Sequence, residues 1–121
     1  MKKILIVDDD KDILMIVELL LNAHGYKVQT IFDPTDIVED VKRFRPGVIL
    51  MDVNIGQHDG REICKTLKSD ALVQSIPIIL FSAMHNLQET HRECEATDFI
   101  VKPFDSLELI KIIEKHLKSA A

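Results

Sequence analysis

The stretch Ile4-Leu5-Ile6-Val7-Asp8-Asp9-Asp10, ILIVDDD in one-letter code, runs four apolar residues directly into three carboxylates. An apolar run of this length predicts a strand buried on both faces, as in a parallel sheet covered by helices. Three adjacent carboxylates repel one another, and burying a carboxylate is costly unless a positive group pairs with it. The stretch therefore predicts a buried strand that ends in a concentration of negative charge.

Four more segments of the chain have the composition of strands. Three of them are short, nearly continuous apolar runs, at Val48–Met51, Ile76–Phe81 and Phe99–Val101. A further run, Lys27–Phe32, mixes apolar and polar residues and is predicted to be an edge strand. Together with the first run they predict a sheet of five strands.

Helical patterns separate these strands. In Asp12–Ala23 the apolar residues share one face, and Gly25 follows where a helix end favours positive φ. Further helices are expected to begin at aspartates that can cap them and to continue with apolar stripes. These starts are Asp33-Pro34, Asp59-Gly60 and Asp105-Ser106, and a weaker, polar helix is predicted over Asn86–Glu95.

The resulting order is strand–helix, repeated five times. Right-handed crossovers then predict an α/β fold: one domain, residues 1–121, with a doubly wound, flavodoxin-like five-stranded parallel sheet in the order 2-1-3-4-5. The chain shows no internal repeat, linker or low-complexity tract.

The overall composition restricts the class of protein. The 121 residues are 46% hydrophobic and 29% charged with a net charge of −5, which argues against binding nucleic acid or an anionic membrane. No apolar run approaches the ~20 residues of a membrane span, and the start of the chain is too short for a secretory signal. Two cysteines are typical of a reducing compartment. We expect a cytoplasmic protein.

Polar side chains follow four of the predicted strands. Asp8 and Asp9 follow the first, Asp52 the third, Ser82 the fourth, and Lys102-Pro103 the fifth. In the order 2-1-3-4-5 these strand ends are neighbours, at the edge where such sheets bind ligands. Clustered carboxylates are ligands that suit Mg²⁺, so these residues predict a magnesium site. Asp10 is expected to point away from it, because successive residues leaving a strand alternate in direction.

Each of these residues also has a simpler interpretation. The aspartates could form a solvated turn at a helix start, Ser82 could be a helix cap, and Phe99 is most simply a core residue. His85, His91 and Cys94 lie close in sequence, but a structural zinc site wants a fourth ligand and none is evident. Only the aspartates, Ser82 and Lys102 together predict a site.

The motifs resemble those of one family over essentially the whole chain. They are Asp8-Asp9, the segment DVNIGQHDG at residues 52–60, Phe81-Ser82-Ala83, and Phe99-Ile100-Val101-Lys102-Pro103-Phe104. In these motifs the chain resembles the CheY-like receiver domains of two-component response regulators. The resemblance implies a phosphorelay, in which Asp52 accepts a phosphoryl group from a histidine kinase phosphohistidine.

The resemblance also implies roles for single residues. Asp9, Asp52 and the backbone carbonyl of Asn54 would hold Mg²⁺ directly, and Asp8 would hold it through a water molecule. Lys102, placed by a cis bond to Pro103, would pair with one phosphoryl oxygen, and Ser82 would hydrogen-bond another. Ser82 and Phe99 would then act as switch residues.

The implied partners are proteins. They are a sensor histidine kinase or phosphotransfer protein as donor, and either a separate target or a fused output domain as receiver of the signal. The target would bind the face made by the fourth helix, fifth strand and fifth helix. The domain would catalyse only its own phosphorylation and dephosphorylation, and so would not be an enzyme in the ordinary sense. No output domain follows in this sequence, so it is either a stand-alone domain or a piece of a longer protein.

The sequence departs from the family pattern in the loops. Gly56 stands where a proline is usual, and Glu95 stands where a glycine is usual. The segment between Ser82 and Lys102 is slightly short, so the fourth helix is expected to be short or irregular.

Two other functions use a similar set of residues. A phosphatase of the haloacid dehalogenase type also combines aspartate, Ser/Thr, Lys and Mg²⁺, but Asp12 occupies the last position of its first motif and no cap insertion is present. A receiver-like scaffold that takes no phosphate would not need the complete set of acids, Ser82 and Lys102. A flavodoxin would have a Ser/Thr/Gly-rich loop after the first strand.

Overall fold

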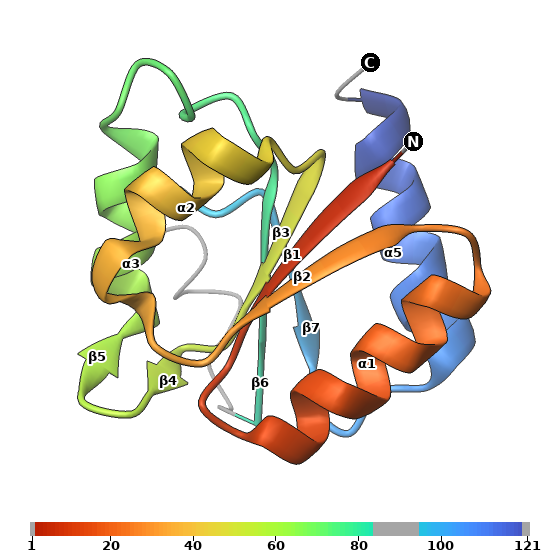
Figure 1. Ribbon diagram of the computed structural model, residues 1–121. Helices are drawn as coiled ribbons and strands as arrows, with labels where there is room; N and C mark the ends of the chain where they lie inside the picture. The colour runs from red at the N-terminus through yellow and green to blue at the C-terminus, as the bar shows by residue number, and fades with distance from the viewer. Residues whose placement is uncertain (1, 84–94, 120–121) are drawn as a thin grey trace.

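A five-stranded parallel sheet runs through the centre of the molecule, with helices on both faces (Figure 1). The computed structural model describes residues 2–83 and 95–119. The parallel strands lie in the order β2-β1-β3-β6-β7, which is the predicted order 2-1-3-4-5 counted along the chain. Their bounds are β1 Lys3–Val7, β2 Lys27–Ile31, β3 Val48–Met51, β6 Ile78–Ser82 and β7 Asp98–Val101.

The interior strand β1 is buried on both faces, as the sequence predicted. Ile4 and Ile6 belong to one apolar cluster, which includes side chains of α1 and α5, whereas Leu5 and Val7 belong to another, which includes side chains of α2 and α3. All four residues are fully buried. The alternation arises because successive side chains of a strand point to opposite faces.

The helices begin close to the predicted positions. They are α1 Lys11–Ala23, the short 3-10 helix η1 Pro34–Asp36, α2 Ile37–Phe44, α3 Gly60–Lys68 and α5 Ser106–Ser119. The carboxylates of Asp10, Asp33 and Asp59 cap the first turns of α1, η1 and α3. Apart from Glu95, the predicted helix over 86–95 lies outside the described residues, as do His85, His91 and Cys94. No helix in the described ranges is long and apolar enough to cross a membrane.

Most boundaries differ from the prediction by one residue, and the larger differences lie at β6, at the start of α2 and in the loop after Asp52. Strand β6 begins at Ile78 rather than Ile76 because Pro77 has no N–H for the ladder, and it continues through Ser82. The segment after Asp33 begins as a 3-10 helix, and α2 begins only at Ile37. The loop after Asp52 forms a small antiparallel hairpin, β4 Asn54–Ile55 with β5 His58–Asp59, which the sequence pattern did not predict.

Residues with positive φ lie next to several of these helices and strands. Gly25, with φ of 87°, follows α1 as predicted. Arg45 and Glu95 adopt φ of 54° and 63°, although neither is a glycine. Glu95 therefore takes the backbone conformation that the glycine usual at this position would supply, at a cost of about 1 kcal/mol. The departure at Glu95 leaves β7 in the predicted place in the sheet.

Candidate functional site

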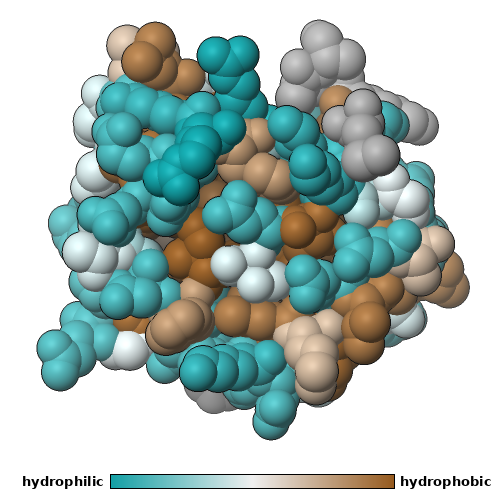
Figure 2. Space-filling view, in the orientation of Figure 1, coloured by the Kyte–Doolittle hydropathy of each residue, from teal (hydrophilic) through white to brown (hydrophobic). Residues whose placement is uncertain are grey.

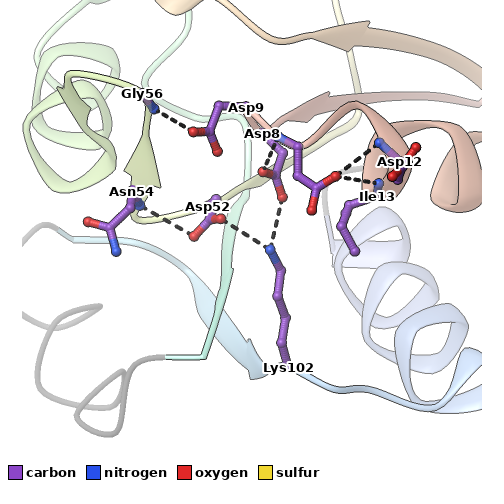
Figure 3. Close-up of polar contacts among 9 residues, drawn as sticks. Asp8, Asp9, Asp12, Ile13, Asp52, Asn54, Gly56 and Lys102 are labelled. Atoms are coloured by element: carbon purple, nitrogen blue, oxygen red, sulfur yellow. Dashed lines mark hydrogen bonds and ion pairs between the residues drawn. The ribbon is translucent and has the colours of Figure 1, made fainter.

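The polar residues predicted to form a site meet at the carboxyl edge of the sheet (Figure 3). Asp8 and Asp9 follow β1, Asp52 follows β3, and Lys102 follows β7. The parallel pairing of β1 with β3, of β3 with β6 and of β6 with β7 brings these strand ends together. The sheet order thus converts residues far apart in sequence into one cluster.

Lys102 is the positive centre of the cluster. Its Nζ lies 2.9 Å from Asp8 Oδ2 and 3.1 Å from Asp52 Oδ2, so one ammonium donates to both carboxylates (Figure 3). The same Nζ lies 4.6 Å from the ring centroid of the buried Phe81, a cation–π contact. The Lys102–Pro103 peptide bond is cis, as the resemblance implied.

Burial dominates the charge state of Asp8. Its side chain is only 1% exposed, and desolvation raises the pKa of the carboxyl above its ordinary value. Hydrogen bonds from the Asp10 N–H and from Lys102 lower that pKa in part, whereas the charge of Asp52 raises it further. Burial alone would lower the pKa of Lys102, but the two carboxylates outweigh it and raise the pKa. The lysine is therefore held charged.

Asp52 is reachable from solvent at one side. Its side chain is 12% exposed, and its second oxygen, Oδ1, accepts a hydrogen bond of 3.3 Å from the Asn54 N–H. Gly60 packs directly behind it, since a Cβ at Gly60 would meet the Asp52 carbonyl and the Val53 backbone. A residue larger than glycine at position 60 would displace the chain that carries Asp52.

The two remaining aspartates of the opening stretch point in different directions. Asp9 is exposed, and its Oδ2 accepts a hydrogen bond of 3.0 Å from the N–H of Gly56. Asp10 is not part of the acidic cluster; its Oδ1 accepts from the N–H groups of Asp12 and Ile13 and caps the start of α1. The prediction that Asp10 points away is therefore confirmed.

The acidic cluster has the composition of a divalent cation site. One carboxylate oxygen from each of Asp8, Asp9 and Asp52 lies within 4.8 Å of the others, a grouping found nowhere else among the described residues. Three carboxylates facing one ammonium leave an excess of two negative charges at neutral pH. Mg²⁺ binds through one or two carboxylates plus waters, so the residues present fit it.

Ser82 lies at the end of β6 and Phe99 lies in β7, on the strands predicted for them. Ser82 is buried at the end of β6, and its carbonyl accepts a hydrogen bond of 3.0 Å from the Lys102 N–H. Phe99 is half-buried in β7 and packs against the apolar cluster on the α2–α3 side of the sheet. Asn54, in β4, is exposed.

Sequence reasoning missed three features. The buried His116 on α5 places Nε2 2.9 Å from Asp98 Oδ2, a pairing that no motif announces. The Gly56 hydrogen bond to Asp9 was also missed, because a backbone N–H leaves no pattern beyond the glycine itself. A hydrophobic hollow lined by Ile13, Ile16, Val17, Ala83, Lys102, Pro103 and Phe104 was not foreseen either.

This hollow borders the acidic cluster through Lys102. Beside it, α1 exposes three large apolar side chains, Met15, Ile16 and Leu19, at 55%, 59% and 65%. Figure 2 shows apolar side chains gathered at the lower right, over the α1 seen in Figure 1. An apolar surface thus adjoins the charged site.

Comparison with known proteins gives a consistent match. The sequence model of the response regulator receiver domain family matches residues 4–114 of this chain. A putative response regulator from Chloroflexus aurantiacus J-10-fl has a TM-score of 0.89 at 27% identity, covering 97% of this chain and 98% of that one. The chemotaxis response regulator CheY4 of Vibrio cholerae has a TM-score of 0.87 at 28% identity, covering 96% and 98%.

A third similar structure was solved with a metal ion. It is the receiver domain of the sensor histidine kinase PA1611 from Pseudomonas aeruginosa PAO1, with a magnesium ion coordinated in its active-site cleft. Its TM-score is 0.87 at 26% identity, and the match covers 97% of this chain and 98% of that one.

Proposed function

Because this chain belongs to the response regulator receiver domain family and is a receiver domain of two-component signalling, we propose that it accepts a phosphoryl group on Asp52. The donor is the phosphohistidine of a sensor histidine kinase or of a phosphotransfer protein, and Mg²⁺ is the cofactor. The receiver domain extends over residues 1–121 in this proposal.

The observation that carries the proposal is the setting of Asp52. Its carboxylate is held between Lys102 and the Asn54 N–H, next to two further acids, and it retains a solvent-exposed side. A carboxylate can act as a nucleophile, and phosphoryl transfer asks of a protein mainly in-line positioning and neutralisation of charge. A carboxylate oxygen forms the new bond to phosphorus, while the P–N bond breaks and its electron pair stays on the imidazole.

The neighbouring residues have distinct roles in this proposal. Asp9, Asp52 and the Asn54 carbonyl would hold the metal directly, and Asp8 would hold it through water; bound there, Mg²⁺ would neutralise oxygens of the phosphoryl group. The magnesium in the cleft of the Pseudomonas domain supports this assignment. Lys102 transfers its hydrogen bond from Asp52 to a phosphoryl oxygen, and the Ser82 hydroxyl donates to another.

The domain acts on itself and signals through proteins. It catalyses its own phosphorylation and the later hydrolysis of the aspartyl phosphate, and has no other substrate. The apolar hollow beside Lys102 supports a protein donor, because a protein docked on it would also reach the site. A cytoplasmic location, supported by the cysteine content of the chain, completes the proposal.

The output passes through the β7 side of the sheet. Movement of Ser82 toward the phosphoryl group frees space for Phe99, which is half-buried here and can move further inward. The target, a separate protein or a fused domain, binds the face that includes β7 and α5. The fourth helix that the sequence predicts for that face, Asn86–Glu95, lies outside the described residues apart from Glu95.

Intact-mass measurement after incubation with acetyl phosphate and Mg²⁺ tests the proposal. We expect one acid-labile phosphoryl group on the wild type, none on Asp52→Asn, and none when Mg²⁺ is chelated. Asp98→Asn is the matched control, because Asp98 is a part-buried acid in a separate cluster and its loss should leave the adduct intact. A wild type without an adduct, or steady turnover of a small phosphate ester, contradicts the proposal.

A further inference from the structure

We infer that the backbone N–H of Gly56 is a positioning group of the metal site, because it holds the carboxylate of Asp9 toward Asp8 and Asp52. The inference rests on the Mg²⁺ site of the proposed function and concerns a residue outside the acidic cluster itself. Gly56 N lies 3.0 Å from Asp9 Oδ2, across 47 residues of sequence. In Figure 3 the other oxygen of Asp9 lies on the side of Asp8 and Asp52.

Asp9 needs such a group more than its neighbours do. Asp8 and Asp52 are each held by Lys102 and by a backbone N–H two residues further along the chain. Asp9 is exposed, and within the described ranges the Gly56 N–H makes the hydrogen bond that fixes its side chain. Without this bond an exposed aspartate would sample several rotamers, of which only some direct an oxygen to the cluster.

The small hairpin after Asp52 delivers this N–H. Asn54 pairs with Asp59 and Ile55 with His58, so Gly56 and Gln57 form the turn. Ile55 is fully buried and anchors the hairpin to the core. Gly56 has φ of 60°, in the left-handed region, and a Cβ there would meet nothing within 4 Å. Position 56 therefore favours glycine because of its backbone conformation, and not for lack of space.

In the family pattern position 56 is usually proline, so this contact with Asp9 belongs to this chain. Proline at position 56 would remove both the N–H and the positive φ. It has no N–H to donate, and its ring fixes φ near −65°. Groups that orient metal ligands typically change metal affinity about 10–100-fold when they are lost. Gly56 thus couples the loop after Asp52 to the metal ligand that follows β1.

Magnesium titration of the unphosphorylated chain, followed by two-dimensional NMR, tests the inference. We expect the dissociation constant for Mg²⁺ to rise at least about tenfold in Gly56→Pro. Gly56→Asn keeps the N–H and tolerates positive φ, so it should recover most of that loss.

Gly25→Pro is the matched control. Gly25 also has positive φ, open space around its Cα and an N–H that donates over 3.0 Å, in this case to the Asn22 carbonyl. Its replacement should destabilise the fold as Gly56→Pro does and leave the affinity for Mg²⁺ unchanged.

The outcomes separate this inference from the proposed function. A wild type that does not bind Mg²⁺ overturns the proposed metal site itself. A wild type that binds, with equal or tighter binding by Gly56→Pro, overturns the inference alone. If Gly56→Pro does not fold, hydrogen exchange of the Gly56 amide decides. The protection of the Gly56 amide from exchange should fall in Asp9→Ala. Unchanged protection would show that the hydrogen bond between Gly56 and Asp9 does not hold the two residues together, and would overturn the inference.

Discussion

Among the described residues, two clusters hold aspartates against basic side chains, and the two differ in their balance of charge. At the carboxyl edge of the sheet, Asp8, Asp9 and Asp52 face the single ammonium of Lys102. Between β7 and α5, Asp98 lies 2.9 Å from His116 Nε2 and 3.8 Å from Lys115 Nζ, and its Oδ1 accepts from the Phe99 N–H. The first cluster has more acidic than basic side chains. The second has one acidic side chain against two basic ones.

The pKa values follow this difference. Burial raises the pKa of Asp8, and the available donors do not compensate. Burial would also raise the pKa of Asp98, but the His116 contact, the Phe99 N–H and Lys115 together lower it. The balanced cluster stabilises the fold, whereas the unbalanced one weakens it until a ligand supplies positive charge. This surplus of negative charge distinguishes the functional cluster from the structural one.

The largest expected effect comes from removing the one cation of the unbalanced cluster. Lys102→Met leaves Asp8 and Asp52 buried without a counter-charge and should lower the metal-free free energy of unfolding by roughly 3 kcal/mol. Lys115→Met is the control in the balanced cluster. Lys115 is 70% exposed and 3.8 Å from Asp98, so its loss should cost at most about 0.5 kcal/mol. Urea unfolding at pH 7 compares them, and equal costs would erase the distinction between the clusters.

The next effect concerns the acid of the balanced cluster. Asp98→Asn should lower the free energy of unfolding at pH 7 by roughly 2 kcal/mol, since it weakens a charge-assisted hydrogen bond to His116. The folded-state pKa of Asp98 is lowered, so its stabilisation is present above the ordinary value of 3.8 and is lost as pH falls through the folded-state pKa. The variant should therefore lose less stability than the wild type in acid. Parallel acid unfolding curves for the two proteins would contradict this.

The smallest expected effect has the opposite sign. Asp8→Asn should raise the metal-free free energy of unfolding at pH 7, by less than Asp98→Asn lowers it. Because the folded-state pKa of Asp8 is raised, the folded protein binds the proton more tightly, and stability falls as pH rises from 3.8 through the folded-state pKa. Asp8→Asn has no carboxyl at position 8 to titrate, so its free energy of unfolding should not show this fall with rising pH. Chelator-treated samples unfolded by urea at pH 4 and pH 7 measure it, and a variant less stable than the wild type at pH 7 would show that Asp8 is adequately paired.

Much of the fold could be predicted because the parallel strands are continuous apolar runs. Ile4–Val7 and Val48–Met51 are buried on both faces, as strands inside a helix-covered parallel sheet must be. The hairpin at 54–59 could not be predicted in this way. Its strands are two residues long and carry Asn54, His58 and Asp59, so no alternation of apolar and polar residues marks them.

The site was predictable as far as strand ends determine it. Asp8 and Asp52 come together because β1 and β3 are neighbours. Lys102 follows β7, which lies beyond β6 in the sheet, and its long side chain reaches both carboxylates. The pairing of Asp98 with His116 depends on how α5 packs across β7, which an isolated histidine does not indicate. The same holds for backbone donors such as the Gly56 N–H.

The dependence of stability on Mg²⁺ tests the central claim most directly, namely that the acidic cluster is a cation site left unbalanced by the protein alone. The free energy of unfolding should increase with Mg²⁺ by mass action, about 2.7 kcal/mol at a concentration 100 times the dissociation constant. Asp98→Asn should gain the same increment, and Asp9→Ala should gain much less. A wild type whose unfolding is insensitive to millimolar Mg²⁺ would contradict the account.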